Sequence, residues 1–121
     1  MCVFRHPAAT VESILKICEN DAQMRALKMT AERAVKVWSS MYEHVLHKHF
    51  HSGDWLFTHF EQILTGDGLE RLQSFLGCNV DRGFPEQKLA KSSASVGVPA
   101  SALTLYRALC ERAGFVDRSL A

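Results

Sequence analysis

The chain has 121 residues, with 14 lysines and arginines against 13 aspartates and glutamates and a formal net charge of +1 at pH 7. This near-neutral balance gives no electrostatic argument for general binding to nucleic acid or to a membrane surface. No stretch approaches the ~18 apolar residues of a membrane span, and the N-terminus lacks the long apolar region of a signal peptide. We therefore expect a single globular domain over residues 1–121, with no nucleic-acid or membrane partner.

The four cysteines are widely spaced, and none of them forms a CxxC pair. Their density is too low for a disulfide framework, and each lies among apolar neighbours. We expect reduced, partly buried thiols in a cytoplasmic protein. The cysteines are Cys2, Cys18, Cys78 and Cys110.

The N-terminal half predicts a short strand followed by helices. Residues 2–4 form a short β run, and Pro7 suits the first turn of a helix over residues 8–18. Thr30 is a plausible N-cap for the longest helix, about 31–50. Its mainly apolar positions recur in steps of three and four residues, which indicates one buried face: Ala34, Trp38, Met41, Tyr42, Val45, Leu46 and His49.

The second half predicts one more strand and further helices. Residues 55–59 form an aromatic-rich strand, and residues 60–64 form a turn or short helix. Another helix ends at Gly77, and the last spans about 99–114. Two strands do not make a stable sheet alone. The chain is therefore either essentially helical, or its strands belong to a sheet whose other members are missing.

The first candidate site is Arg5-x-Pro7-x5-Ser13. An arginine leaves the end of a strand just before a helix begins, and a serine follows about a turn and a half into that helix. The guanidinium fork, the helix N-terminus and the hydroxyl all suit a phosphate. On the residues alone, a solvated surface arginine and a serine without a ligand remain open.

Four segments in order resemble the PAPS-dependent sulfotransferases. Residues 2–15 (CVFRHPAATVESIL) resemble that family's strand-Arg-x-Pro-x5-Ser-helix segment. The pattern Trp-x3-Tyr-x3-Leu of residues 38–46 is similar to its long helix. Residues 54–64 (DWLFTHFEQIL) are similar to its strand and Tyr-Glu-Asp-Leu-like turn, and residues 67–77 to a helix that commonly ends in Phe-Leu-Gly.

The resemblance implies an α/β fold, an incomplete P-loop-like sulfotransferase fold that is mostly helical in this chain with two short strands. It implies binding of 3′-phosphoadenylyl sulfate (PAPS) or of adenosine 3′,5′-bisphosphate (PAP). Arg5 and Ser13 stand where the family holds the 3′-phosphate. Phe60 stands where the Tyr-Glu-Asp-Leu-like turn has a tyrosine and lacks its hydroxyl, so we expect it to make packing contacts only. Gln62 replaces an acidic residue of that turn.

The family's Gly-rich 5′-phosphosulfate loop and its catalytic base lie upstream of the arginine strand, with which this chain starts. The only similar stretch, Thr65-Gly66-Asp67-Gly68, is acidic, lacks the following Lys-Ser/Thr and is better explained as a helix cap, with Asp67 and Glu70 at capping-box spacing. We therefore expect the C-terminal part of a sulfotransferase, from a truncated or fragmentary gene. Such a chain would keep only the half of the donor site that binds the 3′-phosphate, and it would contain no catalytic residue. It would be inactive alone and would transfer sulfuryl to an unknown acceptor only when the missing part of the enzyme is supplied.

Two alternatives stay open. One is a non-enzymatic helical protein-interaction domain, in which Arg5 and Ser13 have no ligand. The other is a split enzyme, in which a second polypeptide supplies the Gly-rich loop. If part of a sheet is missing, the apolar stripe of residues 38–46 and the strand of residues 55–57 would be partly exposed, and we expect self-association through that surface.

Two further clusters have both functional and ordinary explanations. His44, His47, His49 and His51 include pairs at metal-sharing spacing, but histidines near a helix C-terminus are also favoured by the helix dipole. A basic, hydroxyl-rich stretch would suit the 3′-phosphate, as a late basic loop does in some sulfotransferases, or would simply be solvated. It contains Lys88, Lys91, Ser92, Ser93 and Ser95.

Overall fold

The computed structural model describes residues 1–85 and 97–120, which divide into two compact units. Among the described residues, the first unit comprises 1–5, 54–85 and 107–120, and the second comprises 6–53 and 97–106. The described residues are mostly helical with two short strands, as predicted. This content is compatible with a mixed α/β class.

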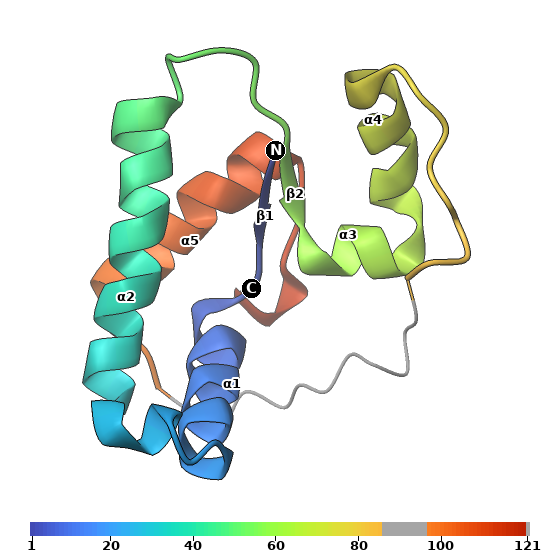
Figure 1. Ribbon diagram of the computed structural model, residues 1–121. Helices are drawn as coiled ribbons and strands as arrows, with labels where there is room; N and C mark the ends of the chain where they lie inside the picture. The colour runs from blue at the N-terminus through green and yellow to red at the C-terminus, as the bar shows by residue number, and fades with distance from the viewer. Residues whose placement is uncertain (86–96, 121) are drawn as a thin grey trace. The chain divides into compact units, whose positions relative to one another are not determined.

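The first unit contains a two-stranded parallel sheet (Figure 1). Strand β1 (Cys2–Phe4) pairs with β2 (Phe57–His59), and Phe4 lies opposite His59. The opening segment is therefore extended, as predicted. The second strand begins two residues later than predicted, although the Leu56 carbonyl still accepts a hydrogen bond of 2.8 Å from the Cys2 amide.

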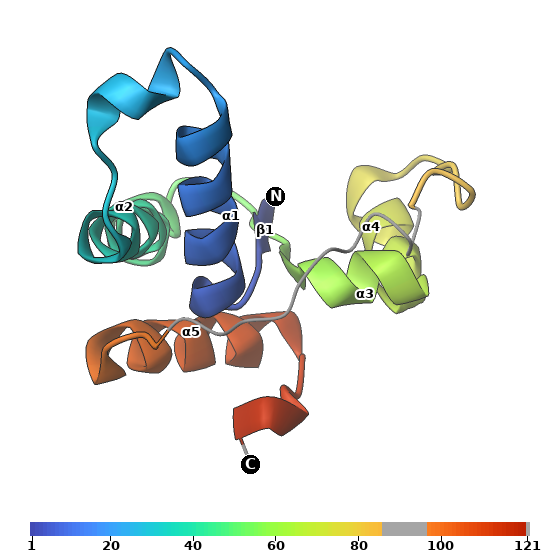
Figure 2. The same cartoon turned by 90° about the horizontal axis from the view of Figure 1, so that it is seen from below.

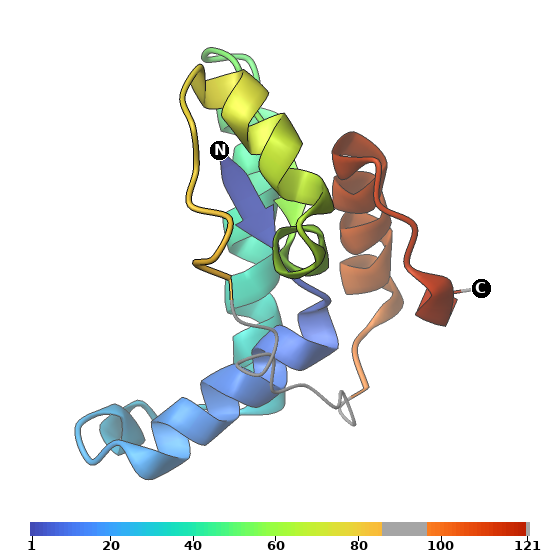
Figure 3. The same cartoon turned by 90° about the vertical axis from the view of Figure 1, so that its right-hand side faces the viewer.

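Two helices follow β2 in the same unit, α3 (Phe60–Thr65) and α4 (Asp67–Leu76). Gly66 joins them with a φ of 87°, a left-handed conformation that glycine adopts without strain, and α4 leaves in a new direction (Figure 3). The N-cap of α4 is Gly66, and Asp67 is already helical. The predicted capping box at Asp67 is therefore wrong, although a helix cap does lie within Thr65–Gly68, as expected, at Gly66.

The second unit is built on α1 (Pro7–Asn20) and α2 (Ala31–His44), which pack against each other (Figures 1 and 2). Thr30 caps α2, and its hydroxyl accepts from the Arg33 amide at 3.2 Å. The helix continues as a π-helical segment over Val45–His49. The buried side chains of α1 and α2 include Val11, Cys18, Ala34, Val35 and Trp38.

Helix α5 (Ala100–Ala113) belongs to both units, with its first half in the second unit and its last residues in the first. It follows Pro99 and ends at Gly114, close to the predicted bounds. Short 3₁₀ segments lie at Met24–Leu27 and Arg118–Leu120. No helix in the described part of the chain is long and apolar enough to cross a bilayer.

Candidate functional site

The candidate site in the first unit lies at the carboxyl end of the parallel strands. Arg5 directly follows β1 and Phe60 directly follows β2, and the register brings these ends together. The Arg5 guanidinium carbon lies 4.9 Å from the centre of the Phe60 ring. Ligands of parallel sheets gather at this edge. Phe60, expected only to pack, packs against the very arginine that the sequence singled out.

The Arg5 guanidinium is half-buried, and its Nη2 atom is buried without a hydrogen-bond partner among the described residues. A buried donor left unpaired costs about 1–3 kcal/mol, and more when the group is charged. The Phe60 ring is within cation–π distance of the guanidinium, and such a contact does not use the N–H donors. Such a group is prepared for an anion such as phosphate or carboxylate.

The turn that carries Phe60 is fixed by His59 and Gln62. His59 is the N-cap of α3, and its Nδ1 accepts a hydrogen bond of 3.0 Å from the Glu61 amide. The Gln62 side-chain oxygen accepts from the His59 amide at 2.9 Å and completes a capping box. The position of the Phe60 ring is thus fixed by two hydrogen bonds between side chains and backbone amides at the start of α3.

The hydrogen bonds of Gln62 explain why an amide is suited to a position where the sulfotransferase pattern has an acidic residue. Its Nε2 donates to the Ala113 carbonyl at 3.0 Å, and the Arg71 guanidinium donates to the same oxygen. An ionised carboxylate could not donate here, because it has only acceptors. The amide therefore has a structural role in joining α3 to the end of α5, which the sequence alone did not indicate.

Ser13 belongs to the second unit, in α1, and is half-buried. Its hydroxyl forms no hydrogen bond with any described residue. The N-terminus of α1 is partly satisfied from within, because His6 Nδ1 accepts from the Ala8 amide at 3.1 Å. The helix start therefore offers one donor fewer than the sequence argument assumed.

Two other predicted clusters are the histidines near the end of α2 and the basic, hydroxyl-rich stretch of residues 88–95. His44 and His49 have ring centres 5.2 Å apart, but no three metal-ligating side chains gather anywhere in residues 1–85 and 97–120. Lys88, Lys91, Ser92, Ser93 and Ser95 lie outside the described residues.

None of the four cysteines, all of which lie in the described part of the chain, forms a disulfide. Cys2, Cys18 and Cys110 are buried and Cys78 is exposed. Burial raises the pKa of the Cys2 thiol from 9.0 to about 11, against an opposing effect of the N-terminal ammonium. A thiol with so high a pKa is a poor nucleophile, so Cys2 is not a candidate for catalysis.

Comparison with known proteins gives no neighbour: no family model, no curated protein and no solved structure matches the chain. The sulfotransferase resemblance therefore stays a prediction that rests on the residues quoted for it.

Proposed function

We propose that this chain binds the 3′-phosphate of an adenosine nucleotide through Arg5, as the donor-binding part of a PAPS-dependent sulfotransferase. The observation that carries the proposal is the buried, unpaired Nη2 of Arg5 at the carboxyl end of β1. The identity of the nucleotide comes from the sequence resemblance. The chemistry of Arg5 itself supports an anion with more than one oxygen.

The surroundings of Arg5 favour binding over a solvated role. A surface arginine normally directs its donors into water, whereas here one terminal nitrogen is removed from solvent. The Phe60 ring 4.9 Å away restricts the guanidinium plane and lowers the entropy lost when a ligand binds. Since Nη2 is buried, a phosphate would accept from it only after neighbouring side chains move, and would then satisfy the donor that the protein leaves unpaired.

Ser13 enters the proposal through the resemblance, which assigns it as a second ligand of the same phosphate. Its hydroxyl is available, since no described residue bonds to it. We treat it as a weaker contributor, because a neutral hydroxyl contributes about 0.5–1.5 kcal/mol where a charged donor contributes about 1.5–3 kcal/mol.

The proposed role is nucleotide binding, with sulfuryl transfer only when a 5′-phosphosulfate loop is supplied. The 121 residues contain no Gly-rich Ser/Thr phosphate loop, and Thr65–Gly68 spans the junction of α3 and α4. We assign no catalytic residue in this chain. The acceptor, a hydroxyl or an amine in this reaction class, is not specified by Arg5 or Ser13.

Calorimetric titration with PAP tests the proposal. We expect saturable binding to the wild type, and Arg5→Ala to lose about 1.5–3 kcal/mol of binding free energy, which is roughly a 10- to 150-fold loss of affinity. Ser13→Ala should lose less. Adenosine 5′-monophosphate, which lacks the 3′-phosphate, should bind wild type and Arg5→Ala equally weakly.

Arg82→Ala is the matched control, because Arg82 belongs to the same unit and is exposed, with only a long contact of 3.9 Å to Glu70. It should bind PAP like the wild type. Equal affinities of wild type and Arg5→Ala for PAP would overturn the proposal.

That outcome would favour the second candidate, a helical interaction domain that associates with itself or with another protein. One observation supports it independently. Large apolar side chains of the second unit are well exposed: Ile17 is 56%, Leu27 47%, Val37 45% and Met41 59% exposed. Such side chains commonly mark contact surfaces when they lie together.

A further inference from the structure

A cavity of about 760 Å³ lies within the second unit. One wall is a face of α2 from Ala31 to Glu43, and the other is the chain from Gly97 to Ser101 at the start of α5. Pockets for small molecules usually measure about 300–1,000 Å³ and combine apolar walls with a few polar groups. Neither Arg5 nor Ser13 lines this cavity.

The wall from α2 follows the helical repeat. Glu32, the pair Val35 and Lys36, the pair Ser39 and Ser40, and Glu43 recur in steps of three and four residues, and so share one side of the helix. Val35 is buried and, with Ala31 and Pro99, supplies the apolar part of the cavity. Polar groups lie further along the same side.

The serines of the cavity are uncommitted. Among the described residues, the hydroxyls of Ser39, Ser40 and Ser101 have no hydrogen-bond partner. Serine is a poor residue for the middle of a helix, where its hydroxyl often bonds back to a carbonyl of the preceding turn. Two adjacent serines without such bonds weaken α2 and leave donors and acceptors directed to the cavity side.

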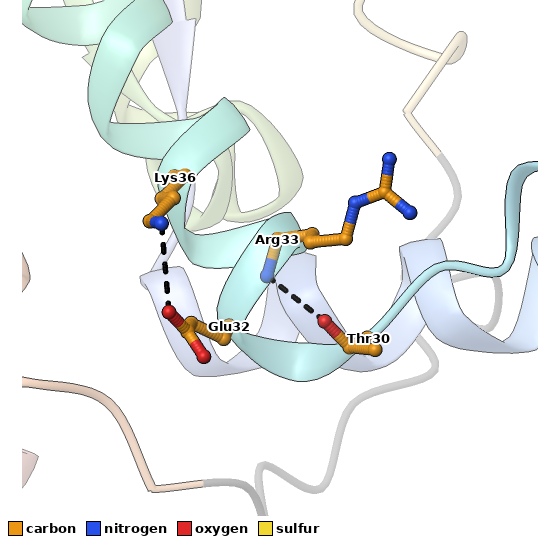
Figure 4. A network of polar contacts seen from close by, with 4 residues as sticks. All are labelled: Thr30, Glu32, Arg33 and Lys36. Atoms are coloured by element: carbon orange, nitrogen blue, oxygen red, sulfur yellow. Dashed lines mark hydrogen bonds and ion pairs between the residues drawn. The ribbon is translucent and has the colours of Figure 1, made fainter.

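One of the two carboxylates that line the cavity has no ion-pair partner among the described residues. Lys36 pairs with Glu32 at 3.5 Å (Figure 4). Arg33 extends away from that pair (Figure 4), and its guanidinium donates to the carbonyls of Leu27 and Lys28. Glu43 has no ion-pair partner in the described part of the chain. Among the described lining residues, two carboxylates face one ammonium, and Glu43 is the carboxylate that this ammonium does not pair with.

We propose that this cavity binds a small molecule that carries a primary amine and several hydroxyls, such as an amino sugar. The ammonium group pairs with Glu43, the hydroxyls exchange hydrogen bonds with the serines, and the hydrocarbon face of the ring lies on Val35 and Pro99. A phosphorylated or carboxylated ligand is disfavoured by the unpaired carboxylate. This site does not depend on the proposed nucleotide function.

Amide NMR titration of the whole chain with three matched sugars tests the proposal. Glucosamine is cationic, glucose is neutral and glucuronate is anionic, while their rings are alike. We expect millimolar binding in the order glucosamine, glucose, glucuronate, with shifts confined to residues 31–43 and 97–101. Raising the salt concentration should reduce the preference for glucosamine, because the Glu43 contact is near the surface.

Glu43→Gln should reduce glucosamine affinity about two- to fivefold and leave glucose binding unchanged. Glu19→Gln is the matched control, since Glu19 is an exposed glutamate of the same unit outside the cavity; it should behave as the wild type. Equal binding of the three sugars, the same glucosamine affinity in Glu43→Gln, or shifts outside the cavity would each overturn the proposal. Titration of Glu43→Gln with PAP, which should match the wild type, keeps this test separate from the nucleotide test.

Discussion

His59 combines two roles in one buried side chain of the first unit. Its ring is 2% exposed and stacks on Phe115, with centres 3.9 Å apart and planes within 9°. Phe4 makes a further, edge-on contact with the His59 ring, with centres 5.2 Å apart. At the same time its Nδ1 caps α3. Packing and capping at this residue together hold the turn that carries Phe60.

These two roles can be separated by substitution. His59→Ala removes both and should destabilise the fold by about 3 kcal/mol. His59→Asn loses the ring contacts but keeps a side-chain acceptor suited to an N-cap, and should recover about 1 kcal/mol of that loss. Urea unfolding followed by circular dichroism measures the difference. Equal stability of the two variants would show that the cap contributes nothing.

Other residues show where sequence reasoning stops. Arg5 could be chosen from the sequence because strand, arginine and proline follow one another. The burial of its unpaired Nη2 could not be predicted, because the burial of one atom depends on packing between segments far apart in the sequence, such as the contact of Arg5 with Phe60. His6 and His59 were missed as caps, since N-cap prediction looks for Ser, Thr, Asp or Asn. Gln62 departs from the motif in sequence, and only the structure shows that its side-chain amide donates a hydrogen bond to the Ala113 carbonyl.

At the scale of the elements, the helices could be predicted more reliably than their ends. The apolar repeat predicted a helix to about residue 50, and a helical chain does reach His49. The change to π-helical geometry at Val45, whose amide donates to both Met41 and Tyr42, leaves no periodic signature. Strand β2 is shorter than its aromatic run, because pairing with the three residues of β1 limits its length.

The junction of α3 and α4 depends on a close approach at Gly68. A Cβ at this position would lie 3.0 Å from the Gln62 Cβ and 3.1 Å from the Gln62 carbonyl oxygen. Alanine is favoured over glycine in a helix by about 1 kcal/mol, but overpacking against backbone costs about 1–3 kcal/mol. We expect Gly68→Ala to lower the free energy of unfolding by about 1 kcal/mol, measured by urea unfolding.

Gly97→Ala is the control for that substitution. A Cβ at Gly97 meets nothing within 4 Å, and its φ is not in the left-handed region. The variant should be as stable as the wild type or slightly more stable, because alanine has fewer unfolded conformations. A Gly68→Ala chain that gains as much stability as Gly97→Ala would show that α4 can move away from Gln62 without loss.

At the scale of the whole molecule, each unit is assembled from separate stretches of sequence, and α5 contributes to both. Segmentation of this kind is only partly visible in composition, since Ser52 and Gly53 precede the boundary at 53–54 but no Pro-, Gly- or Ser-rich linker marks residues 5–6 or 106–107. The cysteines are distributed so that they report on both units. Cys2 and Cys110 are buried in the first unit and Cys18 in the second, while Cys78 is exposed.

Thiol labelling should therefore distinguish the exposed Cys78 from the three buried cysteines by its rate. At pH 8 the native chain should react rapidly with an alkylating reagent only at Cys78. Cys2 is protected both sterically and because its pKa, raised from 9.0 to about 11 by burial, lowers its thiolate fraction about a hundredfold at this pH. The protection due to the pKa should weaken as the pH rises toward 11, and all four thiols should react in 8 M urea.

Mass spectrometry of peptides identifies the labelled sites, and Cys78→Ser should remove the rapid phase. Rapid labelling of Cys18 in the native chain would contradict its burial in α1 and with it the packing of the second unit, whereas rapid labelling of Cys2 would contradict the burial of β1, from which Arg5 follows.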